Sequence, residues 1–588
     1  MKTLHVVVLL ALLPSPAASQ PATVLDLADA VDTSGVVRRV FGAGGVGQSG
    51  VPVAGGLDVD GDGHTDYAIG HFTADPLGRA NAGVVALVFG DGTFSGSVDA
   101  STVQPGVLRV FGDQPFETAG SEIWMADVTG DGLGDLLICR QSFSPPVMRY
   151  GAGALTVIAG AAALRTHAQT LQAVDLRSPP VGLPVTTIVG AAAGDRFCIW
   201  ARNGDVTGDD VDDLVVGADQ ENHNTQNHTG ALYVLQGGAW LAAGGTLDLA
   251  NLGTGALQGR VARVTFPSGA FEYHLGATCQ IADLDGNGLG EVLGAAALSR
   301  SGASLGPNPS ARAWHASGGS TDGTLYVLWD DNFTPPWPDV LEINLSNPPG
   351  SRTVIRGGNR NVKFGEEILG GLDYDGDGEP DLFVGDLVAD DTPAHNRPTS
   401  GAGYVFYDAP LLRGLDFNLD APPPQVAFST ILGPIAGAIG ADTAAHGDFD
   451  GDGLGDLAFC SPKAGPAGRV DAGVVHVLQG RMGGWPLESE LVIDTAALPP
   501  ESAVWIAEIR GANGKAGSDN GDILCYSGAA GDVDGDGLED LLVNEMEGSG
   551  PAGDDVGNLL AIDGTVLFAI FRDGFESGNV SRWSIAVP

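Results

Sequence analysis

The sequence predicts an all-β fold, a seven-bladed β-propeller of four-stranded antiparallel blades. An acidic nine-residue motif occurs seven times, and successive copies begin 69, 78, 78, 90, 75 and 84 residues apart. Apolar runs of strand length surround every copy. The 588 residues include 90 Gly and 35 Pro, a composition typical of short strands joined by turns. Together these observations favour a tandem β-repeat.

The N-terminal residues have the features of a secretory signal peptide. Lys2 gives a basic start, an apolar stretch runs from Leu4 to Leu13, and Ala17 and Ser19 suit the positions before a cleavage site. The apolar stretch is too short to span a bilayer. The sequence therefore predicts a signal peptide over residues 1–19, a linker over 20–35, and a mature chain that is secreted or held at the cell surface.

Each motif lies in the same strand context. A short apolar run follows it at once, as in Leu214–Val216, and a glycine-led run comes later, as in Gly230–Leu235. A further strand, such as Leu108–Phe111, precedes the next motif. Tandem units of about four strands are typical of propeller blades. A string of separate β-sandwiches is the alternative, but each unit is too short for two packed sheets, so we assign residues 36–563 to one ring.

The ring is predicted to close through its N-terminal strand. Residues 36–41 resemble a fourth strand but precede the first motif, and no comparable run follows the last glycine-led strand. A strand from the N-terminus would complete the seventh blade and cover an open sheet edge.

The seven motif copies carry oxygen-bearing side chains at positions 1, 3, 5 and 9. Position 4 is glycine in every copy, and position 6 is glycine in all but the third, which has Asp210. We predict that the oxygen-bearing side chains are metal ligands: Asp58, Asp60, Asp62, Asp66, Asp127, Thr129, Asp131, Asp135, Asp205, Thr207, Asp209, Asp213, Asp283, Asp285, Asn287, Glu291, Asp373, Asp375, Asp377, Asp381, Asp448, Asp450, Asp452, Asp456, Asp532, Asp534, Asp536 and Asp540.

The ligand chemistry of these loops points to calcium. Ca²⁺ prefers about six to eight oxygen ligands, and alternate residues of a tightly curled loop can point at one centre. Asp and Gly also favour simple acidic turns, but seven copies with one spacing argue against that alternative. An EF-hand needs Glu at position 12, where this chain has apolar residues or Gly294. We expect up to seven Ca²⁺ ions, bound more weakly where Thr129, Thr207 and Asn287 replace carboxylates.

At this point the sequence resembles the FG-GAP family, the repeat of the integrin α-subunit head, in a secreted bacterial form. Phe41-Gly42, Phe111-Gly112 and Phe364-Gly365 match the first element of the repeat. Residues 213–218 (DLVVGA) and 230–234 (GALYV) match the rest. The resemblance implies a seven-bladed ring, calcium in a hairpin loop, and extracellular adhesion or recognition. Calcium loops in all seven repeats depart from integrin heads, which usually keep only some, so the resemblance supports the module and not integrin signalling.

Composition narrows the partners and the redox state. The chain has 73 acidic and 28 basic residues and a formal net charge of −45, which excludes nucleic acid as a partner because phosphate would be repelled. The cysteines are odd in number and far apart, at Cys139, Cys198, Cys279, Cys460 and Cys525. We expect them to be buried, unpaired thiols. The mature chain is expected to be a monomer.

The sequence favours binding over catalysis. The histidines occupy no repeated place, and no Ser/His/Asp order, nucleophile elbow or HExxH motif occurs. We therefore expect a non-enzymatic module that binds a protein or glycan; an extracellular enzyme with its site opposite the calcium loops and a purely structural surface protein are the alternatives. The longest connection between second and third strands carries the candidate ligand-binding residues Arg300, Arg312, Trp314 and His315. Residues 564–588 resemble a short tail of exported bacterial proteins and are either a sorting signal or an unstructured end.

Overall fold

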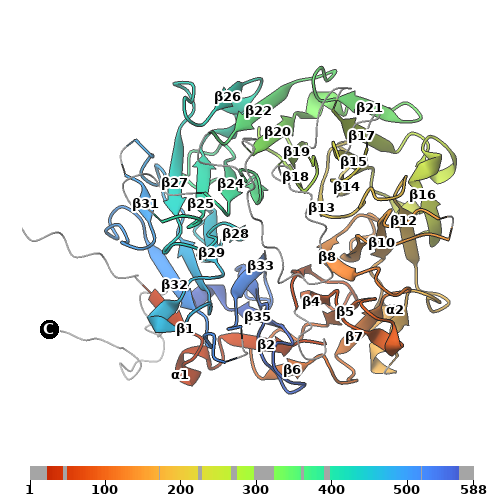
Figure 1. The fold of residues 1–588 in the computed structure, drawn as a ribbon, viewed down its shortest axis with the longest axis horizontal. Helices are drawn as coiled ribbons and strands as arrows, with labels where there is room; N and C mark the ends of the chain where they lie inside the picture. The colour runs from red at the N-terminus through yellow and green to blue at the C-terminus, as the bar shows by residue number, and fades with distance from the viewer. Residues whose placement is uncertain are drawn as a thin grey trace, which may run out of the picture.

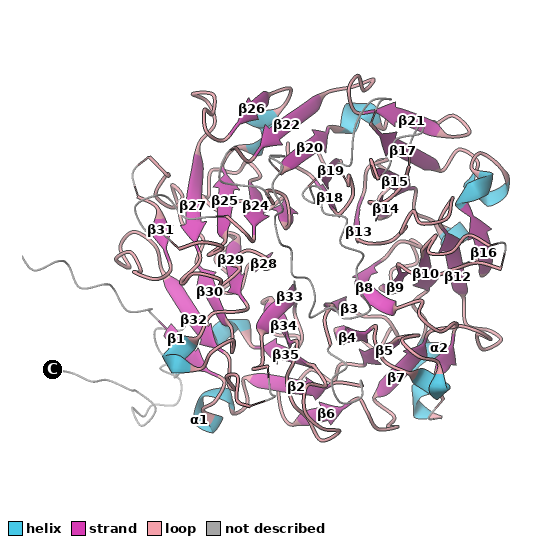
Figure 2. Cartoon of the chain, in the orientation of Figure 1, coloured by secondary structure: helices cyan, strands magenta, loops and turns pink. Residues whose placement is uncertain are grey.

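The computed structural model describes residues 23–43, 50–146, 148–170, 172–222, 228–266, 274–296, 323–358, 363–389, 397–489, 491–517 and 520–568. Seven sheets form a ring in chain order around a central axis (Figures 1 and 2). The predicted seven-bladed β-propeller is therefore confirmed. Its blades have five strands and not the expected four.

The first four strands of each blade pair antiparallel, and the first strand lies nearest the axis. Blade 1 contains β3 (Val53–Leu57), β4 (Asp66–His71), β5 (Val84–Val88) and β7 (Val107–Phe111), and blade 2 contains β8 (Ala119–Ala126), β9 (Asp135–Arg140), β10 (Ala154–Ile158) and β12 (Val185–Val189). Blade 3 contains β13 (Ala201–Gly204), β14 (Asp213–Ala218), β15 (Ala231–Leu235) and β17 (Val261–Thr265), and blade 4 contains β18 (Thr278–Ala282), β19 (Glu291–Ala295), β20 (Thr324–Leu328) and β22 (Arg352–Arg356). Blade 5 contains β23 (Ile368–Gly370), β24 (Leu382–Asp386), β25 (Ala402–Phe406) and β27 (Phe428–Leu432), and blade 6 contains β28 (Ala444–Gly447), β29 (Asp456–Ser461), β30 (Val474–Leu478) and β32 (Ile506–Arg510). Blade 7 contains β33 (Leu524–Gly531), β34 (Asp540–Glu545), β35 (Asn558–Ile562) and β2 (Val37–Phe41).

The fifth strand of each blade comes from a neighbouring repeat. It leaves the connection between the third and fourth strands of the next blade and pairs in parallel with the fourth strand of the blade before, as Leu247 of β16 pairs with Ile188 of β12. From blade 1 to blade 7, these strands are β11 (Val174–Asp175), β16 (Gly245–Asp248), β21 (Leu341–Asn344), β26 (Asp416–Asn418), β31 (Ile493–Asp494), β1 (Thr23–Asp26) and β6 (Ser97–Asp99). Each blade is thereby tied to the next by the backbone as well as by side chains.

Helix is scarce in the described residues. The α-helices are α1 (Ala30–Thr33) and α2 (Ala162–Gln169). Short 3₁₀ segments lie in connections: η1 (Pro76–Gly78), η2 (Ala239–Ala242), η3 (Leu249–Asn251), η4 (Gly255–Leu257), η6 (Asp330–Asn332), η7 (Ala409–Leu412), η8 (Pro466–Gly468) and η9 (Gly564–Val566).

The N-terminal segment closes the ring in two places. β2 pairs antiparallel with β35, with Val37 opposite Ile562, which confirms the predicted closure of the last blade. β1 pairs in parallel with β32 and forms the fifth strand of blade 6. Residues 20–35, expected to be a linker, therefore include a strand of the ring, and Figure 1 shows the red β1 and β2 beside the blue last blades.

The core lies between blades. The second and third strands are almost continuously buried because both faces of each sheet are covered. Every pair of neighbouring blades shares one apolar cluster, including the pair formed by blades 7 and 1. Apolar burial therefore holds the ring together at all its interfaces.

The cysteine prediction was wrong for four of the five residues. Cys139 is bonded to Cys198 and Cys460 to Cys525, whereas Cys279 is a free, buried thiol. The two disulfides join equivalent places of neighbouring blades. Cys139 and Cys460 each lie twelve residues after the first acid of their loop, and Cys198 and Cys525 each lie seven residues before the next. Residues far apart in the chain meet there because the repeat returns them to one interface.

Candidate metal centres

The acidic loops join the first and second strands of each blade, so all seven lie on one side of the ring. The carboxylate at position 1 folds the loop back on itself. In the first loop, Asp58 accepts hydrogen bonds from the backbone N–H of Gly61 at 2.7 Å and of Gly63 at 2.8 Å. The bond from position 6 occurs in all seven loops. Position 6 has a positive φ, which favours glycine and which Asp210 adopts at 62°.

Position 9 has a structural role that we did not predict. Asp66 accepts from the backbone N–H of Val59 and of Gly90, both at 2.8 Å, and so ties the loop to the chain just beyond the third strand. The bond beyond the third strand recurs in every blade. Because its donor always lies two residues after that strand, the constant spacing was the signal available in the sequence.

Burial makes the position-9 carboxylates costly to ionise without a cation. Desolvation raises their pKa to about 7 at Asp66, 6 at Asp135, 7 at Asp213, 8 at Glu291, 8 at Asp381, 8 at Asp456 and 7 at Asp540, and the neighbouring acids of each loop add to the shift. A bound cation would favour the charged form of every one of these groups.

Five loops gather three carboxylates at one point. In each group the candidate ligand oxygens lie within 4.8 Å of one another: Asp58, Asp60 and Asp62; Asp283, Asp285 and Glu291; Asp373, Asp375 and Asp381; Asp448, Asp450 and Asp456; Asp532, Asp534 and Asp540. The other predicted ligands of these five loops, at position 9 of loop 1 and at position 5 of loops 4 to 7, lie outside the groups. Loops 2 and 3, which carry Thr at position 3, form no such group among the described residues.

The donors fit a calcium ion. All are hard oxygen atoms, and Ca²⁺ prefers carboxylate and carbonyl oxygens. Oδ1 of Asp285 and Oγ1 of Thr207, both at position 3, are buried and have no hydrogen-bond partner among the described residues. Thr129 instead donates to Asp135 at 3.3 Å. The residues of loops 1, 4, 5, 6 and 7 can therefore supply a cluster of three carboxylates, whereas loops 2 and 3 have Thr in place of the position-3 carboxylate.

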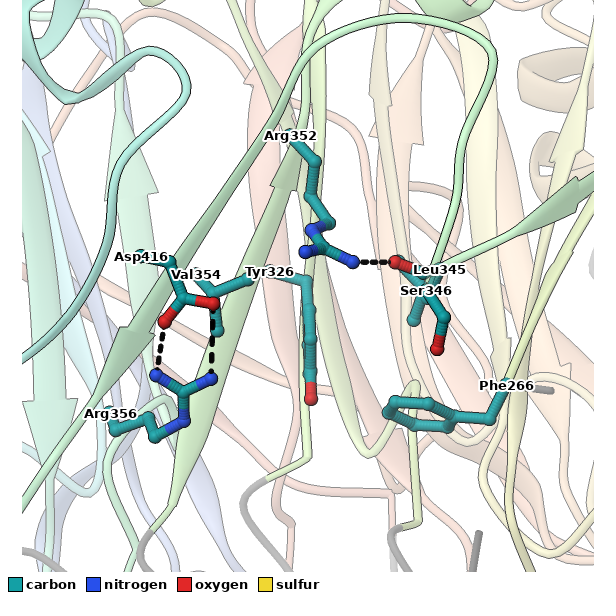
Figure 3. A pocket seen from close by; sticks show the side chains of 8 residues that line it. All are labelled: Phe266, Tyr326, Leu345, Ser346, Arg352, Val354, Arg356 and Asp416. Atoms are coloured by element: carbon teal, nitrogen blue, oxygen red, sulfur yellow. Dashed lines mark hydrogen bonds and ion pairs between the residues drawn. The ribbon is translucent and has the colours of Figure 1, made fainter. Parts of the chain in front are cut away.

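The candidate ligand-binding residues Arg300, Arg312, Trp314 and His315 lie outside the described residues. A pocket of about 250 Å³ lies between blades 3 and 4 (Figure 3). Its aromatic side chains, Phe266 and Tyr326, meet edge to face with their ring centroids 5.4 Å apart. The pocket is lined by Phe266, Tyr326, Leu345, Ser346, Arg352, Val354, Arg356 and Asp416.

The charged groups of this pocket are already engaged. Arg356 forms a two-pronged ion pair with Asp416, and Arg352 donates to the carbonyl oxygen of Leu345 (Figure 3). The pocket therefore combines an aromatic wall with paired charges.

The ends of the chain lie mostly outside the described residues. Residues 1–22 and 569–588, which contain the predicted signal peptide and most of the predicted tail, are in this category. The start of the tail belongs to the ring, because Val566, Leu567 and Phe568 pack in the apolar cluster between blades 6 and 7. Within the described residues, no helix has the length and apolar character needed to cross a membrane.

Comparison with known proteins identifies the repeat. No curated protein matches the chain. The crystal structure of the V. cholerae biofilm matrix protein Bap1 aligns over 90% of this chain and 91% of that chain, with 10% sequence identity and a TM-score of 0.21. Residues 201–235, which run from β13 through β15, match the family model described as FG-GAP repeat. The chain is thus a seven-bladed β-propeller that contains an FG-GAP repeat at residues 201–235, consistent with the integrin-like resemblance of its sequence.

Proposed function

We propose that this protein is a secreted, calcium-binding propeller that acts as an extracellular adhesion or ligand-recognition module and not as an enzyme. The acidic loops carry the proposal, because five of them bring three carboxylates within 4.8 Å of one another, and in four of these groups one of the three is the buried position-9 acid. Such crowding is unfavourable without a cation. The two disulfides support export, since disulfides persist in oxidising compartments.

Each loop residue has a defined part in calcium binding. Position 1 curls the loop, position 9 anchors it to the third strand, and positions 3 and 5 supply further oxygens. A bound Ca²⁺ would neutralise the clustered charge and stabilise the hairpin. The rigid ring would then present the connections of the opposite face to a protein or glycan, as a monomer with a recognition surface.

Calcium removal tests the proposal. Each loop that is filled at a free calcium concentration of 100 times its Kd stabilises the fold by about 2.7 kcal/mol. We expect excess chelator to lower the Tm by several degrees and Ca²⁺ to restore it better than Mg²⁺. Calorimetric titration of the metal-free chain should show several bound ions per chain. An unchanged Tm after confirmed metal removal, with no heat of binding, would refute the calcium function.

A further inference from the structure

Two of the five acidic clusters already contain a cation that belongs to the chain. In loop 1, Arg165 of α2 forms ion pairs with Asp60, at position 3, and Asp62, at position 5; the second pair measures 2.5 Å. In loop 4, Arg413, which caps η7, pairs with Asp285, at position 3, at 2.8 Å and with Asp330 at 3.2 Å. Each arginine thus contacts the position-3 carboxylate of the blade that precedes its own.

The two arginines occupy equivalent places in the repeat. Arg165 lies seven residues after the end of β10 and Arg413 seven residues after the end of β25, each in the connection that supplies the fifth strand to the preceding blade. The equivalent residues in the connections that serve loops 2, 3, 5 and 7 are Ala242, Pro335, Trp485 and Ser95. The two ion pairs are therefore a feature of loops 1 and 4 and not of the repeat in general.

Both guanidinium groups rest on an aromatic ring. The guanidinium carbon of Arg165 lies 5.0 Å from the ring centroid of Phe89, and that of Arg413 lies 5.0 Å from the ring centroid of Trp329. Phe89 and Trp329 are the first residues after the third strands β5 and β20. Stacking on a ring favours a fixed guanidinium position, so each arginine is held where it faces the acids.

The other acidic clusters have no such cation among the described residues. In loop 6, the position-3 acid Asp450 accepts from the neutral amide of Gln479. In loop 5, the residue equivalent to Arg413 is Trp485, whose ring packs 5.5 Å from that of Tyr374. Within the part of the chain that the structure describes, loops 5, 6 and 7 therefore keep three carboxylates without a positive partner.

We propose that Arg165 and Arg413 are built-in counter-cations that neutralise loops 1 and 4 in the metal-free chain and make them the weaker calcium sites among the five acidic clusters. Calcium and guanidinium compete for the same position-3 carboxylate. A positive charge beside the site also repels Ca²⁺ directly. This inference rests on the proposed calcium function and corrects its ranking, because counting carboxylates alone places loop 1 among the strongest sites.

The counter-cation explains how two blades are joined without metal. The arginine comes from blade 2 or blade 5 and the acids come from blade 1 or blade 4, so each ion pair crosses a blade interface. The interfaces between blades 1 and 2 and between blades 4 and 5 are therefore held by a charge pair in the absence of calcium, and loops 5, 6 and 7 carry the calcium dependence of the fold.

Charge-removing variants of the full-length mature chain test the proposal with Ca²⁺ as the probe. R165Q and R413Q are expected to strengthen calcium binding at their loops by about tenfold or more, seen in calorimetric titration as one additional tight site for each substitution. R165K, which keeps the charge, is expected to bind no more tightly than the wild type. R149Q is the matched control, because Arg149 also makes an ion pair with a residue of the next repeat, Asp248 of β16 at 2.6 Å, but pairs with no acidic loop among the described residues.

A metal-free measurement separates this inference from the calcium function. In chelator, R165Q should melt at a lower temperature than the wild type because Asp60 and Asp62 lose their cation; added Ca²⁺ should raise its Tm more than that of the wild type. If R165Q and R413Q both bind Ca²⁺ with the same affinity as the wild type, the counter-cation proposal is overturned. If R165Q does not fold, R413Q decides, because it lies in a different blade. If no variant binds Ca²⁺ but R165Q still melts earlier in chelator than the wild type, the calcium function fails and the counter-cation stands.

Discussion

At the scale of single residues, position 3 of the acidic loop separates the blades. Where it is Asp, three carboxylates meet within 4.8 Å, and where it is Thr, no such group forms in the described loops. The hydroxyl of Thr129 also donates a hydrogen bond to the position-9 acid Asp135 at 3.3 Å, so that one of the carboxylate oxygens is already engaged. The side chain at position 3 thus changes both the charge of the cluster and the availability of the buried oxygen at position 9.

Replacing this threonine should create a sixth acidic cluster. In T129D, a third carboxylate joins Asp127 and Asp135 and the hydroxyl bond to Asp135 is lost. We expect one additional calcium site per chain in calorimetric titration, together with a lower Tm in chelator because the added charge is uncompensated. T102D, which adds the same charge at an exposed threonine outside the loops, should change neither. Equal stoichiometry in T129D and the wild type would contradict the role of position 3.

Buried His476 should destabilise the fold in mild acid, against the opposite effect of the position-9 acids, whose raised pKa values favour folding as the pH falls. It lies in β30 beside Glu508 and Arg510, and desolvation lowers its pKa to about 4. In the unfolded chain the imidazole of His476 is protonated near pH 6.5. The stability that its neutral, buried form contributes is therefore complete above that pH and is lost as the pH drops toward 4. At pH 5 the loss in the free energy of unfolding that is due to His476 is about 2 kcal/mol.

The measurement is the Tm between pH 7 and pH 5 in the presence of chelator, so that calcium release makes no contribution. H476Q should lose less stability over this range than the wild type. H64Q, at an exposed histidine, is the control and should behave like the wild type. Parallel pH profiles for H476Q and the wild type would show that His476 does not account for the acid sensitivity.

At the scale of elements, the strands that the sequence predicts are those whose length and apolar pattern are repeated. The second and third strands are buried apolar runs of five or six residues, and these were predicted in every blade. The fifth strands have two to four residues, and several, such as β16, are partly exposed. Such short strands carry no periodic signal, and their parallel partners belong to another repeat, so they could not be predicted from local pattern.

The disulfides belong to the same scale, because each connects the second strand of one blade with the chain entering the next. The sequence contained the signal in the matched offsets of the cysteines from their loops, but distance along the chain concealed it. Closing a loop of 59 or 65 residues stabilises a fold by about 4 kcal/mol in the chain-entropy model, with measured values somewhat lower.

Removing one disulfide should therefore lower stability without changing the fold. For the double variant C139A/C198A we expect a loss of about 2 to 4 kcal/mol in denaturant unfolding under oxidising conditions. C279A is the matched control, since Cys279 is buried but unpaired, and should lose about 1 kcal/mol or less. A reductant should abolish the difference between the wild type and the double variant. If the two unfold alike under oxidising conditions, the Cys139–Cys198 bond contributes nothing to stability.

At the scale of the whole molecule, the number of blades and the closure followed from counting. Seven motifs predict seven blades because each unit is too small to bury both faces of its sheet alone. Residues 36–41 resemble a fourth strand but precede the first motif, and this position predicted that β2 completes blade 7. The second closure, by β1, was not predicted because the fifth strand was not recognised in any repeat and Thr23–Asp26 was assigned to a linker, although Leu25-Asp26-Leu27 matches Leu247-Asp248-Leu249 at β16.

The two closing strands predict a graded response to truncation of the mature N-terminus. Deleting residues 20–29 removes only β1, together with the buried side chains of Leu25 and Leu27 and the ion pair of Asp26 with Arg469 at 2.9 Å. Blade 6 would keep its four antiparallel strands. We expect this shorter chain to remain monomeric with a lower Tm, because burying two leucines contributes about 3 to 6 kcal/mol.

Deleting residues 20–41 removes β2 as well and leaves β35 as an edge strand whose backbone groups have lost their partners. An unpaired strand of this length is a template for association with other chains. The longer truncation should therefore aggregate or lose cooperative unfolding, whereas the shorter one should not. Light scattering after size-exclusion chromatography, combined with thermal melts, compares the two. If the longer truncation is as monomeric and as stable as the shorter, β2 does not close the ring in solution. If both truncations aggregate equally, β1 is as essential to closure as β2, and the ring depends on both strands of its N-terminal segment.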